Sequence, residues 1–99
     1  MNEYNLSLTI NKQGHILSSN MEFSKRFHFN HIRNEISYHY IIDLFRYEKD
    51  YKKYMDMIQS EVSNVSMCLL RTRSRRLLRL ELYSEPMGDN TYKILGKVL

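Results

Sequence analysis

The sequence contains four histidines and one cysteine, the side chains that most often ligate metal ions in proteins. They are His15, His28, His31, His39 and Cys68. Neither Cys-x-x-Cys nor His-x-x-x-His, the compact spacings of a structural zinc site, occurs among them. We therefore expect no metal site, and the single cysteine excludes an intramolecular disulfide. We interpret Cys68 as a small buried hydrophobe.

The sequence also lacks the patterns of the common catalytic sites. It has no Gly-rich phosphate loop, no Ser-His-Asp order with an oxyanion turn, and no paired-carboxylate motif. Glu48 and Asp50 are interpreted as charges at the start of a helix, where a carboxylate interacts favourably with the helix dipole. We expect that the domain itself is not an enzyme.

Residues 71–79 are strongly basic and contain Arg71, Arg73, Arg75, Arg76 and Arg79. We favour a solvated hairpin, because charges on a hairpin discourage edge-to-edge aggregation. Contact with an acidic face of a partner, or of the rest of its own protein, is the alternative. Nucleic-acid binding is not expected, because acidic residues follow closely and no recognition helix or RNP-type aromatic pattern accompanies the arginines.

The composition fits one small domain. The chain has 99 residues, 42% of them apolar, which suffices for one core but not two. Its net charge of +4 permits an anionic partner without requiring one. No apolar run approaches the roughly 18 residues of a membrane span, and the polar N-terminus does not resemble a signal peptide. We expect a single cytoplasmic domain over residues 1–99, without membrane contact by this segment.

The N-terminal third predicts a hairpin followed by a short helix. Apolar and polar residues alternate over 4–11, which indicates a half-buried strand. A turn at 11–14 and a second strand over 15–18 follow. Ser19 and Glu22 fit a capping box that starts a helix. That helix carries two phenylalanines on one face, Phe23 and Phe27.

The remaining chain predicts one long helix and three strands. Residues 48–62 carry one apolar stripe at helical spacing, made of Tyr51, Tyr54, Met55, Ile58 and Val62. Strands are expected over 65–70, 78–83 and 92–99. In the first of these, we expect Val65, Met67 and Leu69 to face one way, with Met67 and Leu69 in the core, and Ser66, Cys68 and Leu70 to face the other way, with Leu70 on the outer face of the sheet. The predicted fold class is α+β, with helices packed on one face of an antiparallel sheet.

This succession resembles a PAS domain, the small sensory module of signalling proteins. Similar segments are Ile10-Asn11, Gly14, Ile16 to Asn20, Ile41 to Phe45, Asp50, Leu80 to Met87, and Ile94 to Val98. The sequence departs from the family at Tyr38, where glycine is common, and at Arg73-Ser74-Arg75, which replaces a usual Asp-Gly. The resemblance implies a five-stranded sheet with a pocket between it and the helices, and a role in sensing, dimerising or relaying to an attached effector.

Within this family, we expect neither haem nor flavin as a cofactor. The flavin-binding LOV branch needs an Asn-Cys-Arg motif that this sequence lacks, and FAD-binding relatives generally use a tryptophan, which is also missing. Haem-binding relatives commonly take an axial histidine from the long helix, and residues 48–62 contain none. We interpret the histidines as surface or polar-core residues.

We expect a pocket able to hold a small apolar ligand between the sheet and the helices. Its predicted lining is Phe27, Ile42, Phe45, Tyr54, Met55, Ile58, Met67 and Leu69. The opposite face of the sheet is expected to form a homodimer interface through Leu70, Leu95 and Leu99.

These expectations describe a sensory or regulatory domain from a longer protein, and they favour a sensor histidine kinase. The alternatives are the regulatory domain of a transcription activator or of a cyclic-nucleotide signalling enzyme, and a ligand-free protein-interaction module.

Overall fold

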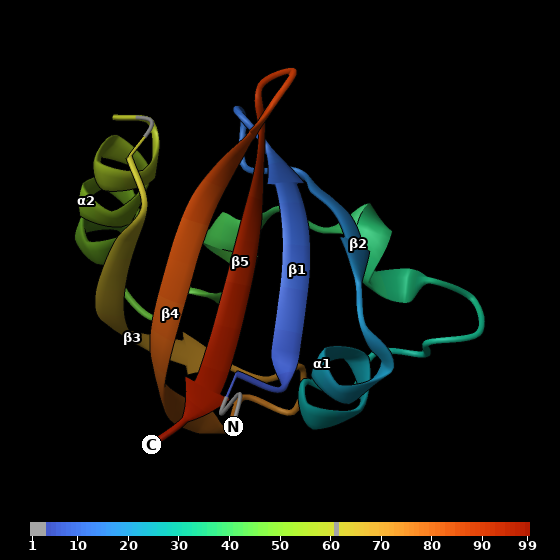
Figure 1. Cartoon of the computed structure of the whole chain (residues 1–99). Helices are drawn as coiled ribbons and strands as arrows, with labels where there is room; N and C mark the ends of the chain where they lie inside the picture. Colours follow the sequence, from blue (N-terminus) through green and yellow to red (C-terminus); the bar gives the residue numbers. More distant parts are fainter. Residues whose placement is uncertain (1–3, 61) are drawn as a thin grey trace.

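The computed structural model describes residues 4–60 and 62–99 and contains one five-stranded antiparallel sheet. Neighbouring strands follow the order β2-β1-β5-β4-β3, so the last strand lies in the centre, between β1 and β4 (Figure 1). The strands are β1 (Leu6–Asn11), β2 (Ile16–Ser19), β3 (Asn64–Arg71), β4 (Leu77–Gly88) and β5 (Thr91–Val98).

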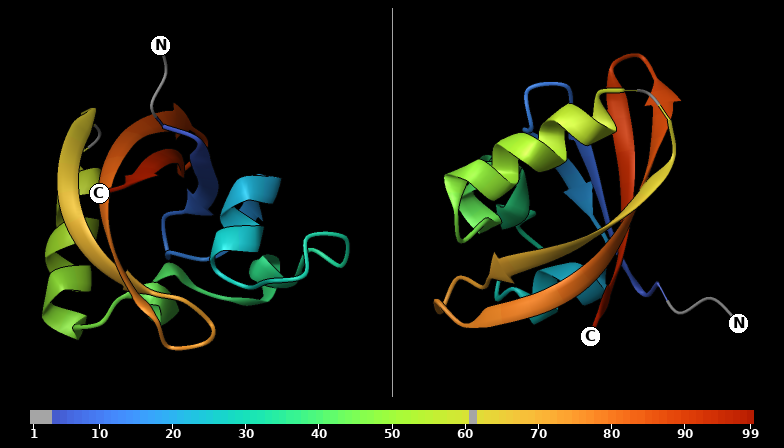
Figure 2. Two further views of the ribbon diagram at one scale, coloured as in Figure 1. Left: turned by 90° about the horizontal axis from the view of Figure 1, so that it is seen from below. Right: turned by 90° about the vertical axis from the view of Figure 1, so that its left-hand side faces the viewer.

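The helices of the described residues lie on one face of this sheet, and none of them covers the other face (Figures 1 and 2). They are α1 (Met21–Arg26), the 3₁₀ helices η1 (Glu35–Tyr38) and η2 (Ile41–Leu44), and α2 (Glu48–Ile58). The architecture confirms the predicted α+β class with a five-stranded antiparallel sheet.

The predicted N-terminal hairpin forms, and an asparagine side chain organises its turn. Asn11 Oδ1 accepts hydrogen bonds from the backbone N–H groups of Gln13 (3.0 Å) and His15 (2.9 Å). Gly14 completes the turn with a φ of +83°, a conformation that residues with a Cβ rarely adopt. β2 begins at Ile16 and ends at Ser19, so it is shifted by one residue toward the C-terminus from the predicted strand over 15–18.

Asn20, not Ser19, caps α1, so the predicted capping box is wrong. Asn20 Oδ1 accepts from the Phe23 N–H (2.9 Å), because α1 begins at Met21 and the cap must immediately precede the first helical residue. Ser19 lies one residue earlier, in β2, and its hydroxyl pairs with the Ser24 hydroxyl at 2.7 Å.

α2 begins at Glu48 as predicted but ends at Ile58 instead of Val62. The Met57 carbonyl accepts from the Ser60 hydroxyl (2.6 Å) and from the Asn64 side-chain amide (3.4 Å), which satisfies it without another helical turn. Val62 is 61% exposed, so the apolar stripe ends before it. Residue 61 of the predicted helix lies outside the described residues.

The core lies between the inner face of the sheet and the helices. Its buried side chains include five residues of the predicted pocket lining, Phe27, Phe45, Tyr54, Met55 and Ile58, together with Leu8, Ile10, Phe23, Leu80 and Ile94. Ile42 belongs to the predicted pocket lining, but it is 37% exposed and its neighbour Ile41 is fully buried instead. Asp43 Oδ2 accepts from the Tyr40 N–H (3.0 Å), which fixes the start of η2, and only one of two adjacent isoleucines can then point inward.

The structure reverses the predicted orientation of β3, so that the residues expected to face the core face outward and the others face the core. Cys68 and Leu70 are buried, whereas Met67 is 61% exposed. The register explains this, because Cys68 lies opposite Leu80 and directly opposed residues share a face of the sheet. Leu70 therefore belongs to the core and not to the outer face, where we expected a dimer contact.

Candidate functional site

A groove of about 580 Å³ runs between α2 and β3, at the edge of the sheet where Figure 1 shows these two elements side by side. Its apolar lining consists of Phe45, Tyr54, Met57, Met67, Cys68 and Leu69. Its polar lining consists of Asp50, Lys53, Asp56 and Ser66. Apolar walls with a few polar groups are typical of sites for small organic ligands.

Contacts from both walls hold the groove in shape. The hydroxyls of Tyr54 and Ser84 lie 2.7 Å apart and join α2 to β4. The Phe45 ring packs against the Tyr54 ring with centroids 5.5 Å apart. Phe45 also forms a β-bridge with Leu70, so the segment between η2 and α2 adds to the edge of β3.

The groove offers binding groups but no activated nucleophile. Burial, with a smaller contribution from the carboxylate of Asp50, raises the pKa of Cys68 to about 12. Burial also raises the pKa of Tyr54. Both side chains are therefore neutral at pH 7, and a thiol in this state is a poor nucleophile.

The structure brings only part of the predicted pocket lining together. Phe45, Tyr54, Met67 and Leu69 line the groove. Three further predicted residues, Phe27, Met55 and Ile58, are buried in the core and are not part of the groove lining. The exposed Ile42 is also absent from that lining.

The polar residues that line the groove are absent from the predicted pocket lining. Asp50, Lys53 and Met57 follow one another at intervals of three and four residues, which places them along one side of α2. This spacing was visible in the sequence. Ser66 and Cys68 were missed because the facing of β3 was predicted the other way round.

The outer face of the sheet carries an ordered mixture of apolar and charged side chains. Leu95 lies opposite Tyr83 in the β4–β5 ladder and is half-buried. Beside them, Glu81 accepts a hydrogen bond from the Tyr4 hydroxyl and forms an ion pair with Lys97 Nζ at 3.6 Å. Of the three predicted interface residues, Leu95 and the 56% exposed Leu99 are accessible, whereas Leu70 is buried.

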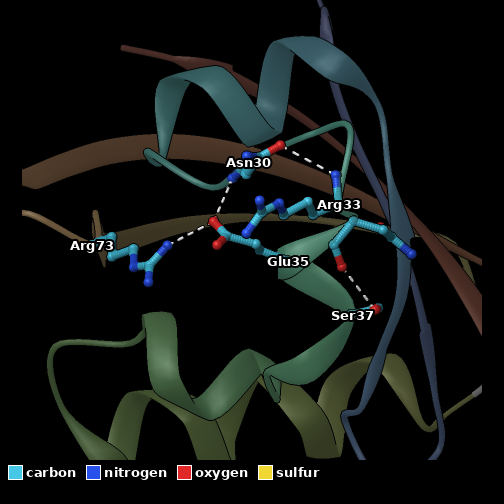
Figure 3. A network of polar contacts seen from close by, with 6 residues as sticks. Asn30, Arg33, Glu35, Ser37 and Arg73 are labelled. Atoms are coloured by element: carbon cyan, nitrogen blue, oxygen red, sulfur yellow. Dashed lines mark hydrogen bonds and ion pairs between the residues drawn. The ribbon is translucent and has the colours of Figure 1, made fainter.

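One arginine of the basic segment 71–79, Arg73, contacts residues between α1 and η1 and in η1, as Figure 3 shows. Arg73 Nη1 lies 2.7 Å from Glu35 Oε1, and its guanidinium lies 5.6 Å from the centre of the Phe29 ring. The same carboxylate oxygen accepts from the Asn30 N–H at 2.6 Å. This hydrogen bond, followed by the positive charges of Arg73 and Arg33, lowers the pKa of Glu35.

Metal-ligating side chains do not cluster in the described part of the chain. No group of three or more His, Cys, Asp or Glu residues among 4–60 and 62–99 could hold a metal ion. No helix within those ranges is long and apolar enough to cross a membrane.

Comparison with known proteins finds similarity in structure only. No protein-family model matches the sequence, and no curated protein matches it. A PAS domain from Desulfitobacterium hafniense superposes with a TM-score of 0.79 at 13% identity, over 97% of this chain and 93% of that one. LOV proteins are also among the similar structures.

Two other similar structures come from named signalling proteins. One is a domain of a sensory box sensor histidine kinase/response regulator from Geobacter sulfurreducens, with a TM-score of 0.78, 15% identity, and coverage of 93% of this chain and 81% of that one. The other is the PAS domain of the Cronobacter turicensis quorum-sensing receptor RpfR in complex with BDSF, with a TM-score of 0.75, 9% identity, and coverage of 100% and 97%. The strand order, the helices on one face and these superpositions together show that the chain has the PAS fold.

Proposed function

We propose that this chain is a sensory PAS domain of a signal-transduction protein, and that the protein is a sensor histidine kinase. The fold is shared with a domain of a sensor histidine kinase, and the described residues include no constellation typical of catalysis. The domain then acts by binding, and an attached effector carries out the chemistry.

We propose the groove between α2 and β3 as the ligand site, and a small, mainly apolar molecule as its ligand. The observation that carries this proposal is the combination of an apolar lining with Asp50 and Lys53 in a groove of about 580 Å³. That volume lies within the roughly 300–1,000 Å³ of small-molecule sites. The structural neighbour in complex with BDSF supports a ligand-binding role for this fold.

Output depends, in this proposal, on a symmetric homodimer formed by the outer face of the sheet. Leu95 and Tyr83 provide the apolar centre, and Glu81 and Lys97 surround it with opposite charges. A ligand that moves α2 would also move β4, because Tyr54 and Ser84 connect the two elements. The change would then reach the interface through the sheet and pass to the effector.

The experiment that tests the ligand site uses the apolar dye 8-anilinonaphthalene-1-sulfonate as its probe. Ser66→Phe fills the groove from β3, and Val65→Phe places the same ring on the opposite face of the same strand. We expect the wild type and Val65→Phe to bind the dye saturably and Ser66→Phe to lose most of this binding. Equal dye binding by all three folded proteins would show that the groove is not the site.

We also propose that the protein carries neither haem nor flavin. The thiol of Cys68 lies on β3 with a raised pKa, and no histidine or tryptophan lines the groove. Purified protein is expected to be colourless. A visible absorbance band that survives dialysis would contradict this proposal.

A further inference from the structure

A second hollow, of about 380 Å³, lies at the end of the molecule where α1 approaches the turn that joins β3 to β4 (Figure 1). α1 contributes Lys25 and Arg26, the segment after it contributes His28, and the turn contributes Thr72 and Arg76. These two segments are far apart in the sequence, so the basic character of the hollow exists only in the folded chain.

Hydrogen bonds fix the turn that carries Arg76. The backbone N–H of Thr72 donates to the Arg76 carbonyl (2.8 Å), and the Arg76 N–H donates to the Thr72 hydroxyl oxygen (3.2 Å). That hydroxyl also lies 2.9 Å from the Ser74 hydroxyl, and Thr72 is 4% exposed. The backbone position of Arg76 is therefore set by hydrogen bonds to the buried Thr72.

The turn is also attached directly to the segment that follows α1. The Arg73 N–H donates to the carbonyl of Phe27 at 3.1 Å, and the Arg73 side chain forms the ion pair with Glu35. These contacts hold the two walls of the hollow at a fixed separation. The backbone segments that carry the basic residues are thus preorganised, which lowers the entropic cost of binding a ligand between them.

The positive charges of the hollow are not neutralised within the described residues. Lys25, Arg26 and Arg76 are exposed, and none of them forms an ion pair with a carboxylate in 4–60 or 62–99. Glu22 is the one acidic residue in the lining. Lys25 and Arg26 stabilise the C-terminal end of α1, but this role does not account for Arg76, which comes from another element.

We propose that this hollow binds a compact phosphate-bearing anion of the di- or triphosphate type. Arginine forms paired, charge-assisted hydrogen bonds with phosphate oxygens, and Lys25 and Arg26 add positive charge from the facing wall. The volume suits a small ligand.

The test is a titration of ¹⁵N-labelled protein with tripolyphosphate, followed by NMR at low salt. We expect saturable shifts confined to the amides of 25–28 and 72–78. Arg76→Gln should weaken binding about tenfold or more, because it removes a charge-assisted contact. Arg79→Gln is the matched control, since it removes the same charge at an exposed position of β4 outside the lining of the hollow. It should change the affinity less than twofold.

Several outcomes would overturn the proposal. They are the absence of saturable shifts at millimolar tripolyphosphate, shifts centred on the groove between α2 and β3, and equal weakening by the two variants. Much tighter binding of a single-stranded oligonucleotide, reduced equally by both variants, would identify an extended polyanion surface instead of a compact site. Equal melting temperatures of both variants would exclude a folding defect as the cause of the difference.

Discussion

The hydroxyls of Tyr54 and Ser84 meet at 2.7 Å in the buried interior, where they form a polar link between α2 and the sheet. Ser84 is 1% exposed and Tyr54 2% exposed, so water does not readily replace either partner. Removing one hydroxyl leaves the other buried without its partner, whereas removing both leaves no unsatisfied group.

We therefore predict that Tyr54→Phe lowers the free energy of unfolding by about 1–3 kcal/mol. The double variant Tyr54→Phe/Ser84→Ala should be destabilised less than the sum of the two single variants. Urea denaturation of all four proteins measures this coupling. Additive losses would show that the two hydroxyls contribute independently.

The second prediction compares two glycines with nearly the same positive φ angle. Gly14 and Gly88 have φ angles of +83° and +84°. A Cβ at Gly14 would lie 3.1 Å from the Tyr51 hydroxyl oxygen, whereas no atom lies within 4 Å of a Cβ at Gly88. Gly88→Ala should cost about 1 kcal/mol for the backbone conformation alone.

Gly14→Ala should cost more than Gly88→Ala, because crowding adds to the same backbone penalty. The Gly14 carbonyl also accepts from the Ile41 N–H at 2.7 Å, so a shift of the turn would disturb η2. Thermal denaturation of the two variants provides the comparison. Equal losses of stability would show that the structure accommodates the added methyl group at Gly14.

The third prediction concerns Asn20, which makes more contacts than a helix cap requires. Its Oδ1 accepts from the N–H groups of Phe23 and Ser7, and its Nδ2 donates to the Asn5 carbonyl at 2.8 Å. Asn20→Ala should cost at least the roughly 0.5–2 kcal/mol of a lost cap. Asn20→Asp retains both acceptor contacts and loses the donor, so its denaturation midpoint should lie between those of Asn20→Ala and wild type.

The fourth prediction tests the proposed dimer. We expect wild-type protein to sediment as a dimer at high micromolar concentration and Leu95→Glu to shift the equilibrium to monomer, because a charge replaces the apolar centre of the interface. Ile32→Glu is the control, since Ile32 is 94% exposed in the loop between α1 and η1. A monomeric wild type, or equal association of both variants, would exclude this surface.

The fifth prediction is a pH dependence that arises from Glu35. Its folded-state pKa is lowered from the ordinary value of 4.5 by the Asn30 N–H and by Arg73. Its contribution to stability is therefore complete above pH 4.5 and is lost as the pH falls through the lower folded-state value.

Glu35→Gln should therefore lower the melting temperature at pH 7 and have progressively less effect as the pH falls below 4.5. Asp56→Asn provides the control, because Asp56 is an exposed carboxylate without an ion pair among the described residues. A melting-temperature difference for Glu35→Gln that is the same at every pH would contradict the proposed role of the carboxylate.

The regular elements of the fold could be predicted because each has one clear apolar face. β1 alternates strictly, and Leu78, Leu80 and Leu82 in β4 alternate with polar or aromatic residues, so only one facing buries the leucines. β3 was predicted incorrectly because apolar residues occupy both of its faces: Met67 and Leu69 on one, Cys68 and Leu70 on the other. Its facing is decided by the ladder with β4, which local alternation does not reveal.

The candidate site was predictable only where its residues follow a regular spacing. Tyr54 belongs to the apolar stripe of α2, and Phe45 ends the segment Ile41 to Phe45 that resembles a PAS domain. The polar wall of the groove and the basic hollow depend on which elements become neighbours. Lys25 and Arg76 line the same hollow where Arg73 donates to the Phe27 carbonyl, and this contact leaves no pattern in the sequence.

The central position of β5 has a consequence for how the domain folds during synthesis. β1 and β4 are not neighbours, and each pairs with β5. While the ribosome still holds residues 91–98, the hairpin of β1 and β2 and the hairpin of β3 and β4 have no strand between them. Both expose unpaired edges, which are prone to aggregation. The sheet closes when β5 emerges, through contacts between residues distant in the chain, and such contacts form slowly.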